Sequence, residues 1–508
     1  MAKQGGAMDW PLFGNARDNT RYSPSGAINP ATVARLRLAW RRDEGFGQVT
    51  WESFPLVLDG RMYLTTNTDE VWSLDGATGR VHWIYAPPVD FLSSLSVQGS
   101  DIPTNRGVAV AGGRVYLLTY DCRLLALDAH NGTLLWQAPV ADPRLGYYET
   151  TAPAVWDGLV FIGGSGGDSG ARGFEAAYDA RTGARVWRRW TVPAPGQGWV
   201  PRQGHHGGGA VWMPPTVDAR TGILYLATGN PSPSFVGSVR PGPDPFTDGI
   251  LALRARDGAV LWFAPLSPHD EWDYDAASPV VIFDAHVHGR SVRAVGEASK
   301  SGYYSILDAR TGRRLFAPTP FVRRIGQRRI RAGALVCPGD LGGSEYSPVA
   351  FSPLTRAVYV SGIDDCMVVK RDSAARVATH HAGQDDAGGV LLPGPDRPSG
   401  TFTAIAVDSG RVLWQRILPG PMIGGATATA GNLVFAGCSN GILYAFDASS
   451  GRIVWQDSMS TAFGSAPIVY TVGGRAYLAV VSGGAAVTAQ YRLGRIGGSL
   501  YVLTPRGS

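Results

Sequence analysis

The residues best suited to chemistry lie in one short acidic stretch, His269 to Asp275, with the sequence His-Asp-Glu-Trp-Asp-Tyr-Asp. If the end of this stretch is extended, Asp273 and Asp275 point to the same side, because alternate side chains share one face of a strand. Two like charges held that close repel, so either one keeps its proton at neutral pH or a cation lies between them. Both arrangements are typical of working sites, and a solvated acidic loop is the alternative interpretation.

A sequence repeat indicates which elements position this stretch. Glycine is followed four residues later by tryptophan in most copies, and by phenylalanine in one: Gly79/Trp83, Gly132/Trp136, Gly183/Trp187, Gly258/Trp262, Gly312/Phe316, Gly410/Trp414 and Gly451/Trp455. In five of these copies an aspartate stands four residues before the glycine: Asp75, Asp128, Asp179, Asp308 and Asp447. The unit predicts a strand, a tight turn with aspartate as acceptor and glycine at positive φ, and a second strand whose tryptophan docks between sheets.

Hairpins of this kind need neighbours to bury their faces, and stacking them radially gives an all-β propeller of four-stranded blades. The gaps at 183–258 and 312–410 must then hold insertions or a blade that lacks the signature. We expect eight blades, with seven as the alternative count, and a ring closed by the strand ending at Ala39-Trp40 and the strand Ser499–Leu503. The propeller would be one domain, residues 9–503, and residues 1–8 an N-terminal extension or an added segment.

Composition excludes several classes of protein. With 44% hydrophobic residues and 67 glycines, the chain can bury a large core, and it has no apolar run of membrane-spanning length. The net charge of +5 comes almost wholly from arginine, without a basic run interleaved with aromatics, so nucleic acid is not an expected partner. Residues 1–10 contain no signal-peptide core, so the chain is either cytosolic or a mature form without its leader.

Several motifs, in order along the chain, resemble those of the pyrroloquinoline quinone (PQQ) dependent alcohol dehydrogenases: Asp9–Ser23, Leu38–Trp40, Asn105–Gly107, Gly229–Pro233, His269–Asp275 and Ser299–Gly302. The resemblance runs from about residue 9 to residue 503. It implies an eight-bladed propeller with PQQ buried on its axis, a metal ion beside the quinone and an aspartate base. PQQ is a planar tricarboxylate with a carbonyl to be polarised, so its site needs cations, a flat aromatic floor and a Lewis acid.

The resemblance also implies roles for individual residues. Asp273 would be the general base, and Lys300 would be the second catalytic residue, bonded to the quinone oxygens. The cofactor contacts implied are Glu52, Arg106, Thr150, Ser165, Gly166, Gly167, Trp212, Lys300 and Glu345; the metal ligands implied are Asp168, Asn230, Asp273 and Asp275. Thr150 could instead be a strand threonine, and Asn230 a turn residue before Pro231.

Two departures from the family bear on the site. Asp168 stands where the family usually has glutamate, which draws that ligand back by about 1.5 Å. Glu345 replaces an asparagine and adds negative charge beside a tricarboxylate. The metal is expected to be Ca²⁺, with a lanthanide ion as the alternative, because Asp275 adds an anionic ligand that a trivalent ion favours.

The remaining expectations concern partners and compartment. The family resemblance pairs Cys337 with Cys366 in a disulfide, which points to the periplasm, and Cys122 and Cys438 are expected to be small buried residues. The chain has no haem-attachment motif, so a separate cytochrome c would accept the electrons. The adjacent cysteine pair of the family is missing, and residues 483–486 are small; we expect a bulky, secondary or polyol alcohol as substrate.

Two other functions compete with this interpretation. A catalytically silent propeller that serves as a binding or assembly scaffold would share the same repeats. A carbohydrate-active propeller would use Asp270 and Glu271 as an acid/base pair, but adjacent residues of a strand face opposite ways.

Overall fold

The computed structural model describes residues 8–44, 50–91, 103–199, 207–377, 387–485, 488 and 492–506. Strands dominate these residues. The other elements among them are one short helix, α2 (Ala374–Val377), and four 3-10 turns: η1 (Val33–Arg35), η2 (Pro143–Leu145), η3 (Gly167–Ser169) and η4 (Gly237–Val239). The predicted all-β class is confirmed. Of the expected extension, residues 1–8, only Met8 lies among the described residues.

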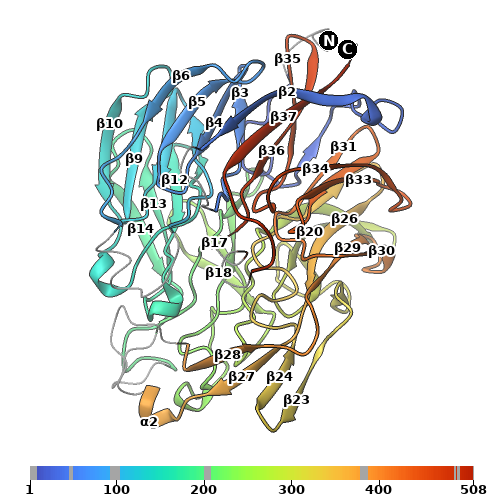
Figure 1. The fold of residues 1–508 in the computed structure, drawn as a ribbon. Coiled ribbons are helices and arrows are strands. Elements are labelled where there is room, and N and C mark those ends of the chain that lie inside the picture. The colour runs from blue at the N-terminus through green and yellow to red at the C-terminus, as the bar shows by residue number, and fades with distance from the viewer. Residues whose placement is uncertain are drawn as a thin grey trace.

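The described strands form nine sheets, and in five of them four consecutive strands pair antiparallel in sequence order (Figure 1). The first two sheets comprise β3 (Leu56–Leu58), β4 (Arg61–Thr65), β5 (Val71–Asp75) and β6 (Val81–Tyr85), then β7 (Ala109–Ala111), β8 (Arg114–Leu118), β9 (Arg123–Asp128) and β10 (Leu134–Pro139). The next three comprise β11 (Ala154–Trp156), β12 (Leu159–Gly163), β13 (Phe174–Asp179) and β14 (Arg185–Trp190); β15 (Thr216–Asp218), β16 (Ile223–Thr228), β17 (Gly249–Arg254) and β18 (Val260–Pro265); and β19 (Val281–Val287), β20 (Arg290–Ala298), β21 (Tyr303–Asp308) and β22 (Thr319–Pro320).

The other four sheets depart from this simple order. One, made of β25 (Ala350–Ser352), β26 (Ala357–Asp364), β29 (Ser399–Ala406) and β30 (Val412–Leu418), is interrupted by strands of a separate sheet. That inserted sheet contains β23 (Gly326–Ile330), β24 (Gly333–Cys337), β27 (Met367–Arg371) and β28 (Gly389–Pro393). The gap at 312–410 therefore holds the inserted sheet and also β25, β26 and β29 of the sheet that it interrupts.

The N-terminal segment completes the last two sheets. One contains β31 (Ala426–Thr429), β32 (Leu433–Gly437), β33 (Ile442–Asp447) and β34 (Ile453–Ser458), with β1 (Tyr22–Ser23) parallel to β31. The other contains β35 (Ile468–Val472), β36 (Arg475–Ser482), β37 (Ser499–Pro505) and β2 (Leu36–Asp43). The pairing of β2 with β37 joins a strand from the N-terminal part of the chain to the last strand, and the two lie side by side in Figure 1.

The hydrophobic core lies between neighbouring sheets. First strands contact one another from sheet to sheet, as β7 does with β11, β15 with β19 and β25 with β31. Leu64 and Trp72 of one sheet share a buried cluster with Leu117 and Leu125 of the next. These neighbouring sheets therefore bury their facing sides against one another, as stacked β-sheets require.

The repeated glycine and tryptophan meet across these interfaces. The ring of Trp83 covers Gly132, which belongs to the following repeat, and its Nε1 donates to the carbonyl of Ala129 at 3.2 Å. A Cβ added at Gly132 would lie 2.7 Å from that ring. Equivalent contacts join Trp40 to Gly79, Trp136 to Gly183, Trp187 to Gly258, Trp262 to Gly312, Phe316 to Gly410 and Trp414 to Gly451.

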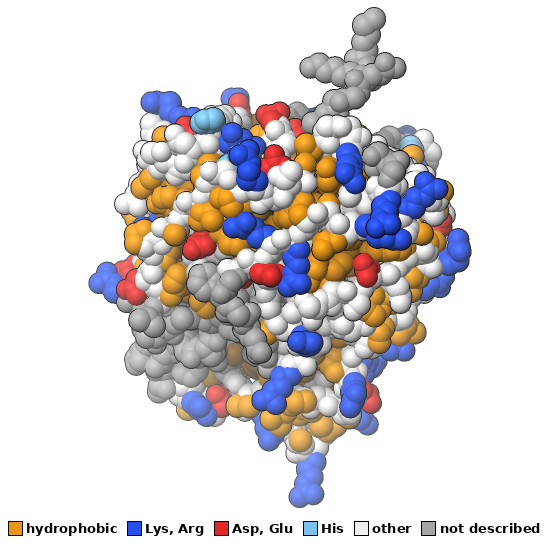
Figure 2. Space-filling model, turned by 45° about the horizontal axis from the view of Figure 1, so that its top comes forward, with side chains coloured by type: hydrophobic (Ala, Val, Ile, Leu, Met, Phe, Trp, Pro, Cys, Tyr) orange, Lys and Arg blue, Asp and Glu red, His pale blue; other side chains and the backbone are white. Residues whose placement is uncertain are grey.

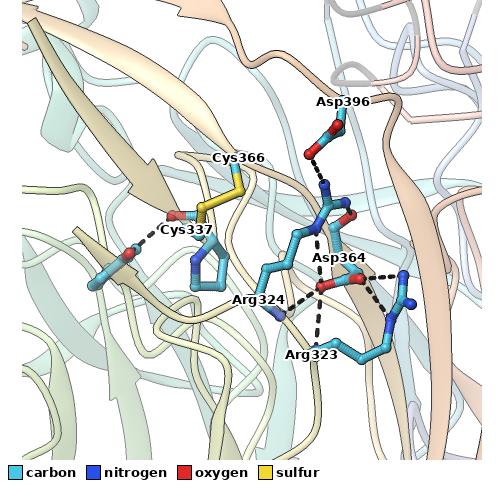
Figure 3. The surroundings of a disulfide bond; sticks show 8 residues. Arg323, Arg324, Cys337, Asp364, Cys366 and Asp396 are labelled. Atoms are coloured by element: carbon cyan, nitrogen blue, oxygen red, sulfur yellow. Dashed lines mark hydrogen bonds and ion pairs between the residues drawn. A yellow bond between two sulfur atoms is a disulfide. The ribbon is translucent and has the colours of Figure 1, made fainter. Parts of the chain in front are cut away.

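The disulfide implied by the family resemblance is present between Cys337 and Cys366, and it joins the last residue of β24 to the residue that precedes the neighbouring strand β27 (Figure 3). Beside it, Arg323 and Arg324 both bind Asp364, and Arg324 also contacts Asp396 at 3.2 Å. The two free cysteines, Cys122 and Cys438, are buried, as predicted.

The surface carries scattered charge. On the face drawn in Figure 2, lysine and arginine side chains are dispersed among hydrophobic and neutral ones. Within the described part of the chain, no helix has both the length and the apolar character to cross a membrane.

Candidate functional site

Antiparallel pairing brings the candidate residues to one end of the sheets. The chain enters a first strand at the end where it leaves the second strand and enters the third. The candidate residues occupy these two kinds of connection. Those that precede first strands are Glu52, Arg106, Thr150, Trp212, Asp273, Asp275 and Glu345; those between second and third strands are Ser165, Gly166, Gly167, Asp168, Asn230 and Lys300.

The acidic stretch is a turn-rich connection between β18 and β19, so the extended geometry considered from the sequence does not occur. Asp273 has a φ of +68°, in the left-handed region that residues other than glycine seldom adopt. The buried Asp270 holds this conformation, because its Oδ2 accepts the N–H groups of Trp272 at 3.1 Å and Tyr274 at 3.0 Å. Two backbone hydrogen bonds therefore flank Asp273.

Lys300 lies among three carboxylates. Its Nζ is 2.8 Å from Asp273 Oδ2, 3.5 Å from Glu345 Oε2 and 3.9 Å from Asp275 Oδ1. Burial by itself would lower the pKa of Lys300, but the nearby carboxylates raise that pKa well above its usual value. Of the two alternatives drawn from the sequence, a retained proton or a nearby cation, the structure shows a cation, because Lys300 lies beside both Asp273 and Asp275. Gly342 packs directly against Lys300, since a Cβ added at Gly342 would lie 2.3 Å from the Lys300 Cβ.

The carboxylate of Asp275 accepts two hydrogen bonds. Trp212 Nε1 donates to its Oδ2 at 2.8 Å, and the backbone N–H of Asn230 donates to its Oδ1 at 3.1 Å. Burial raises the pKa of Asp275 to about 6; Lys300 opposes this shift and Asp273 adds to it. Asp275 therefore connects the predicted aromatic floor, a predicted metal ligand and the Asp273–Lys300 pair.

Glu345, the departure from the family's asparagine, faces the same ammonium group. Burial raises the pKa of Glu345 to about 8, although Lys300 opposes the shift. Among the described residues, its buried Oε2 accepts no hydrogen bond. With a pKa of about 8 the carboxyl is mostly protonated at neutral pH, so Glu345 adds a negative charge beside Lys300 only when it ionises.

Arg106 organises a second group of candidate residues. It forms an ion pair with Glu52 at 2.7 Å, and its NH1 donates to Thr150 Oγ1 at 2.6 Å. Thr150 Oγ1 lies 3.4 Å from Ser165 Oγ. The guanidinium also lies over the ring of Trp212, 5.0 Å from its centroid, while Lys300 Nζ is 6.0 Å from the same centroid. Both cations therefore lie near one aromatic ring.

The loop 165–168 is shaped by close backbone contacts. Gly166 has a φ of +94°, and a Cβ there would lie 2.1 Å from the carbonyl oxygen of Gly146. Ser165 donates its backbone N–H to Glu149 Oε2 at 3.2 Å, and Gly167 begins η3. This packing presents Asp168, which η3 contains, at an exposed position.

The predicted metal ligands are neighbours, but they do not converge on one point. Asn230 Nδ2 lies 3.4 Å from Asp168 Oδ1 and donates to Ser234 Oγ at 2.7 Å. Asp275 is held at the backbone of Asn230, whereas Asp273 is paired with Lys300. Within the described ranges, no three histidine, cysteine, aspartate or glutamate side chains are grouped closely enough to hold a metal ion.

The donor set nevertheless fits the implied groups. A planar tricarboxylate requires cations beside an aromatic face, and Arg106, Lys300 and Trp212 provide them. A hard cation requires carboxylate and amide oxygens, and Asp168, Asn230 and the two aspartates of the acidic stretch are the types it prefers. The buried Nε of Arg106 and Oε2 of Glu345 have no hydrogen-bond partner among the described residues, so both leave capacity for a polar ligand.

Sequence reasoning missed Tyr346 and the positioning role of Asp270. Tyr346 is buried, its ring centroid lies 4.4 Å from the Arg106 guanidinium, and it meets Trp212 edge-on at 6.2 Å. Its place directly after Glu345 is the signal that could have identified it. The position of Asp270 within the acidic stretch carried no comparable signal, because its role depends on which backbone groups its carboxylate reaches.

Two other features do not enlarge the site. The small residues at 483–485 serve close packing, since a Cβ at Gly483 would lie 2.4 Å from the Gly497 carbonyl oxygen; residue 486 lies outside the described ranges. A cavity of about 60 Å³ is lined by the N-terminal segment and by first strands, including Phe13, Leu56 and Thr216, and contains none of the candidate residues. Neither feature supports a large substrate pocket.

Comparison with known families yields two matches. Residues 10–324 match the family described as the beta-propeller domain of glucose, ethanol and alcohol dehydrogenases. Residues 390–494 match the family of the outer membrane protein assembly factor BamB.

Individual relatives cover nearly the whole chain. The dehydrogenase subunit of the quinone alcohol dehydrogenase from Gluconobacter oxydans (strain 621H) is 31% identical over 540 residues, which cover 94% of this chain and 70% of that protein. The structure of quinohemoprotein alcohol dehydrogenase ADHIIG from Pseudomonas putida HK5 superposes with a TM-score of 0.89 and 26% identity, over 98% of this chain and 80% of that one. A europium-containing methanol dehydrogenase gives a TM-score of 0.88 and 28% identity, over 99% and 98% of the two chains.

Proposed function

Because the chain belongs to the PQQ-dependent alcohol dehydrogenases, we propose that it oxidises an alcohol to a carbonyl compound with Asp273 as the general base. The observation that carries this proposal is the Asp273–Lys300 pair beside Trp212. Of the three carboxylates around Lys300, Asp273 has the most exposed side chain, 16% against 4% for Asp275 and 10% for Glu345. Asp273 is therefore the carboxylate best placed to reach a substrate hydroxyl.

The surrounding residues have complementary tasks. Bound PQQ supplies the two-electron acceptor, and its metal partner supplies a Lewis acid. Arg106 and Lys300 would bind the carboxylates and carbonyls of the quinone, with Trp212 as the floor and Glu52, Thr150, Ser165, Gly166, Gly167 and Glu345 at its edge. Asp270 holds the backbone on both sides of Asp273, which keeps the base in place while a proton is taken up.

The metal proposal uses Asp168, Asn230, Asp273 and Asp275 as ligands. Ca²⁺ is our first choice and a lanthanide ion the alternative; a solved relative contains europium. Four oxygen-bearing side chains, three of them anionic, suit either hard cation. Comparing the two ions in reconstitution distinguishes these choices.

The finer architecture is part of the proposal. We propose that eight of the nine sheets are the blades of one propeller, residues 9–503, closed by β2 and β37, and that the ninth is the inserted sheet β23-β24-β27-β28. A separate cytochrome c would accept the electrons, and the Cys337–Cys366 disulfide favours a periplasmic location. The expected bulky, secondary or polyol substrate rests on the missing cysteine pair, since the small residues at 483–485 are used in packing.

Reconstitution tests the reaction. Protein supplied with PQQ and either Ca²⁺ or La³⁺ should oxidise alcohols with an artificial dye acceptor. Asp273→Asn should retain PQQ, measured by its absorbance after gel filtration, while kcat falls by about 100- to 10,000-fold, as for loss of a general base. A lack of activity with both Ca²⁺ and La³⁺ would contradict the proposal.

A catalytically silent scaffold is the second candidate, favoured by the match of residues 390–494 to the BamB family. All candidate site residues lie outside that segment, between Glu52 and Glu345. The scaffold interpretation predicts no quinone absorbance after incubation with PQQ, so the same gel filtration separates the two functions.

A further inference from the structure

Arg240 follows η4, is fully buried and is not one of the candidate site residues. Its guanidinium is paired with Asp244 and donates three further hydrogen bonds to backbone carbonyls. Nε donates to Pro233 at 3.0 Å, and NH2 donates to Ser234 at 3.3 Å and to Asp270 at 2.7 Å. One buried side chain thus joins three separate segments.

Two of these segments carry the proposed metal ligands. Ser234, whose carbonyl Arg240 binds, accepts a hydrogen bond from Asn230 Nδ2 through its Oγ at 2.7 Å. Asp270, whose carbonyl Arg240 also binds, holds the N–H groups on both sides of Asp273. Arg240 therefore connects Asn230 and Asp273 through one intermediate residue on each side.

Charge balance alone does not account for this arrangement. A buried guanidinium needs one anionic partner, which Asp244 provides. The three carbonyl contacts use the planar fork of donors that distinguishes arginine from lysine. They fix the distance between the 230–234 loop and the acidic stretch, where Asp273 has an unfavourable backbone conformation that neighbouring contacts must maintain.

We propose that Arg240 is a positioning residue that preforms the metal-binding half of the site by clamping the Asn230 loop to the Asp270–Asp275 turn. The inference rests on the proposed function, because it concerns the same ligands. Residues behind metal ligands commonly contribute about 10- to 100-fold to metal affinity. Loss of the clamp should therefore weaken metal binding by at least tenfold while the fold persists.

The test uses Tb³⁺ alone, titrated into the full chain and followed by luminescence sensitised by nearby tryptophan. Arg240→Met/Asp244→Asn removes the two charges of the ion pair together, so neither is left buried without the other. Arg240→Lys keeps the charge without the fork and should give an intermediate Kd. Arg21→Met is the matched control, because Arg21 is equally buried and binds the carbonyls of Phe13, Ala426 and Pro467.

We expect the Kd for Tb³⁺ to rise at least tenfold in the double variant and less than twofold in Arg21→Met, both measured well below their melting temperatures. A Kd within twofold of wild type in the double variant would overturn the inference and leave the proposed function intact. An equal rise in Arg21→Met would overturn it as well, by showing a general loss of stability. Failure of the wild-type chain to bind Tb³⁺ or PQQ would remove the proposed function and the inference together.

Discussion

Replacing Gly132 with alanine should destabilise the protein far more than the same replacement at Gly158. The two glycines have nearly identical φ values, +77° and +76°, so alanine at either site costs about 1–2 kcal/mol for the left-handed conformation. They differ in what a Cβ would meet: nothing within 4 Å at Gly158, but the Trp83 ring at 2.7 Å and 2.8 Å at Gly132. Overpacking of this kind adds about 1–3 kcal/mol.

The difference between the two free energies of unfolding, measured by urea denaturation, therefore isolates the contact between tryptophan and glycine. Trp83→Leu is the second variant of the test. Because leucine is smaller than tryptophan, Gly132→Ala should reduce the free energy of unfolding less in the Trp83→Leu background, so the two changes should not be additive. Equal losses at Gly132 and Gly158, or additivity in the double variant, would refute the idea that the repeat glycine exists to receive the tryptophan of the preceding repeat.

Two further predictions concern stability. Burial raises the pKa of Asp69 to about 7, so its contribution is fully present below the unfolded pKa and is lost as pH rises through the folded value; Asp69→Asn should reduce the fall in melting temperature between about pH 4 and pH 7. Alkylation followed by mass measurement should label two more cysteines after reduction, and Cys337→Ser/Cys366→Ser should lower the free energy of unfolding by about 3–4 kcal/mol, given the 29-residue separation. The first prediction is contradicted if Asp69→Asn leaves the pH dependence of the melting temperature unchanged. The second is contradicted if the double cysteine variant has the same free energy of unfolding as the wild type.

The fold class and family could be predicted from the sequence because their signals are local. The turn at Asp75 is held by its Oδ1, which accepts the N–H groups of Ala77 and Thr78, and Gly79 follows at a φ of +71°. The hydrogen bonds that Asp75 accepts in that turn all lie within four residues. A pattern repeated at this scale reports strand, turn and strand without any knowledge of the distant chain, and the family motifs supplied the disulfide and the site residues.

The inserted sheet and the charges around Lys300 could not be predicted in the same way. In the inserted sheet, β24 pairs with β27 across a stretch that contributes two strands to another sheet, so no local period marks it. Lys300 meets Asp273 and Glu345 from two other connections, and Arg240 reaches the acidic stretch from a fourth. Such contacts depend on how loops from separate sheets approach one another, which residue spacing does not encode.

The density of acids around Lys300 has a consequence for the site as a whole. Arg106 is paired with Glu52, which leaves Lys300 facing Asp273, Asp275 and Glu345. Burial raises the pKa values of Asp275 and Glu345 because Lys300 offsets only part of the cost of burying negative charge. A hard cation at the proposed metal site, where Asp275 is one of the ligands, would offset part of the remainder. We infer that the proposed metal would also stabilise this end of the sheets, because its charge would compensate the carboxylates that Lys300 leaves partly unbalanced.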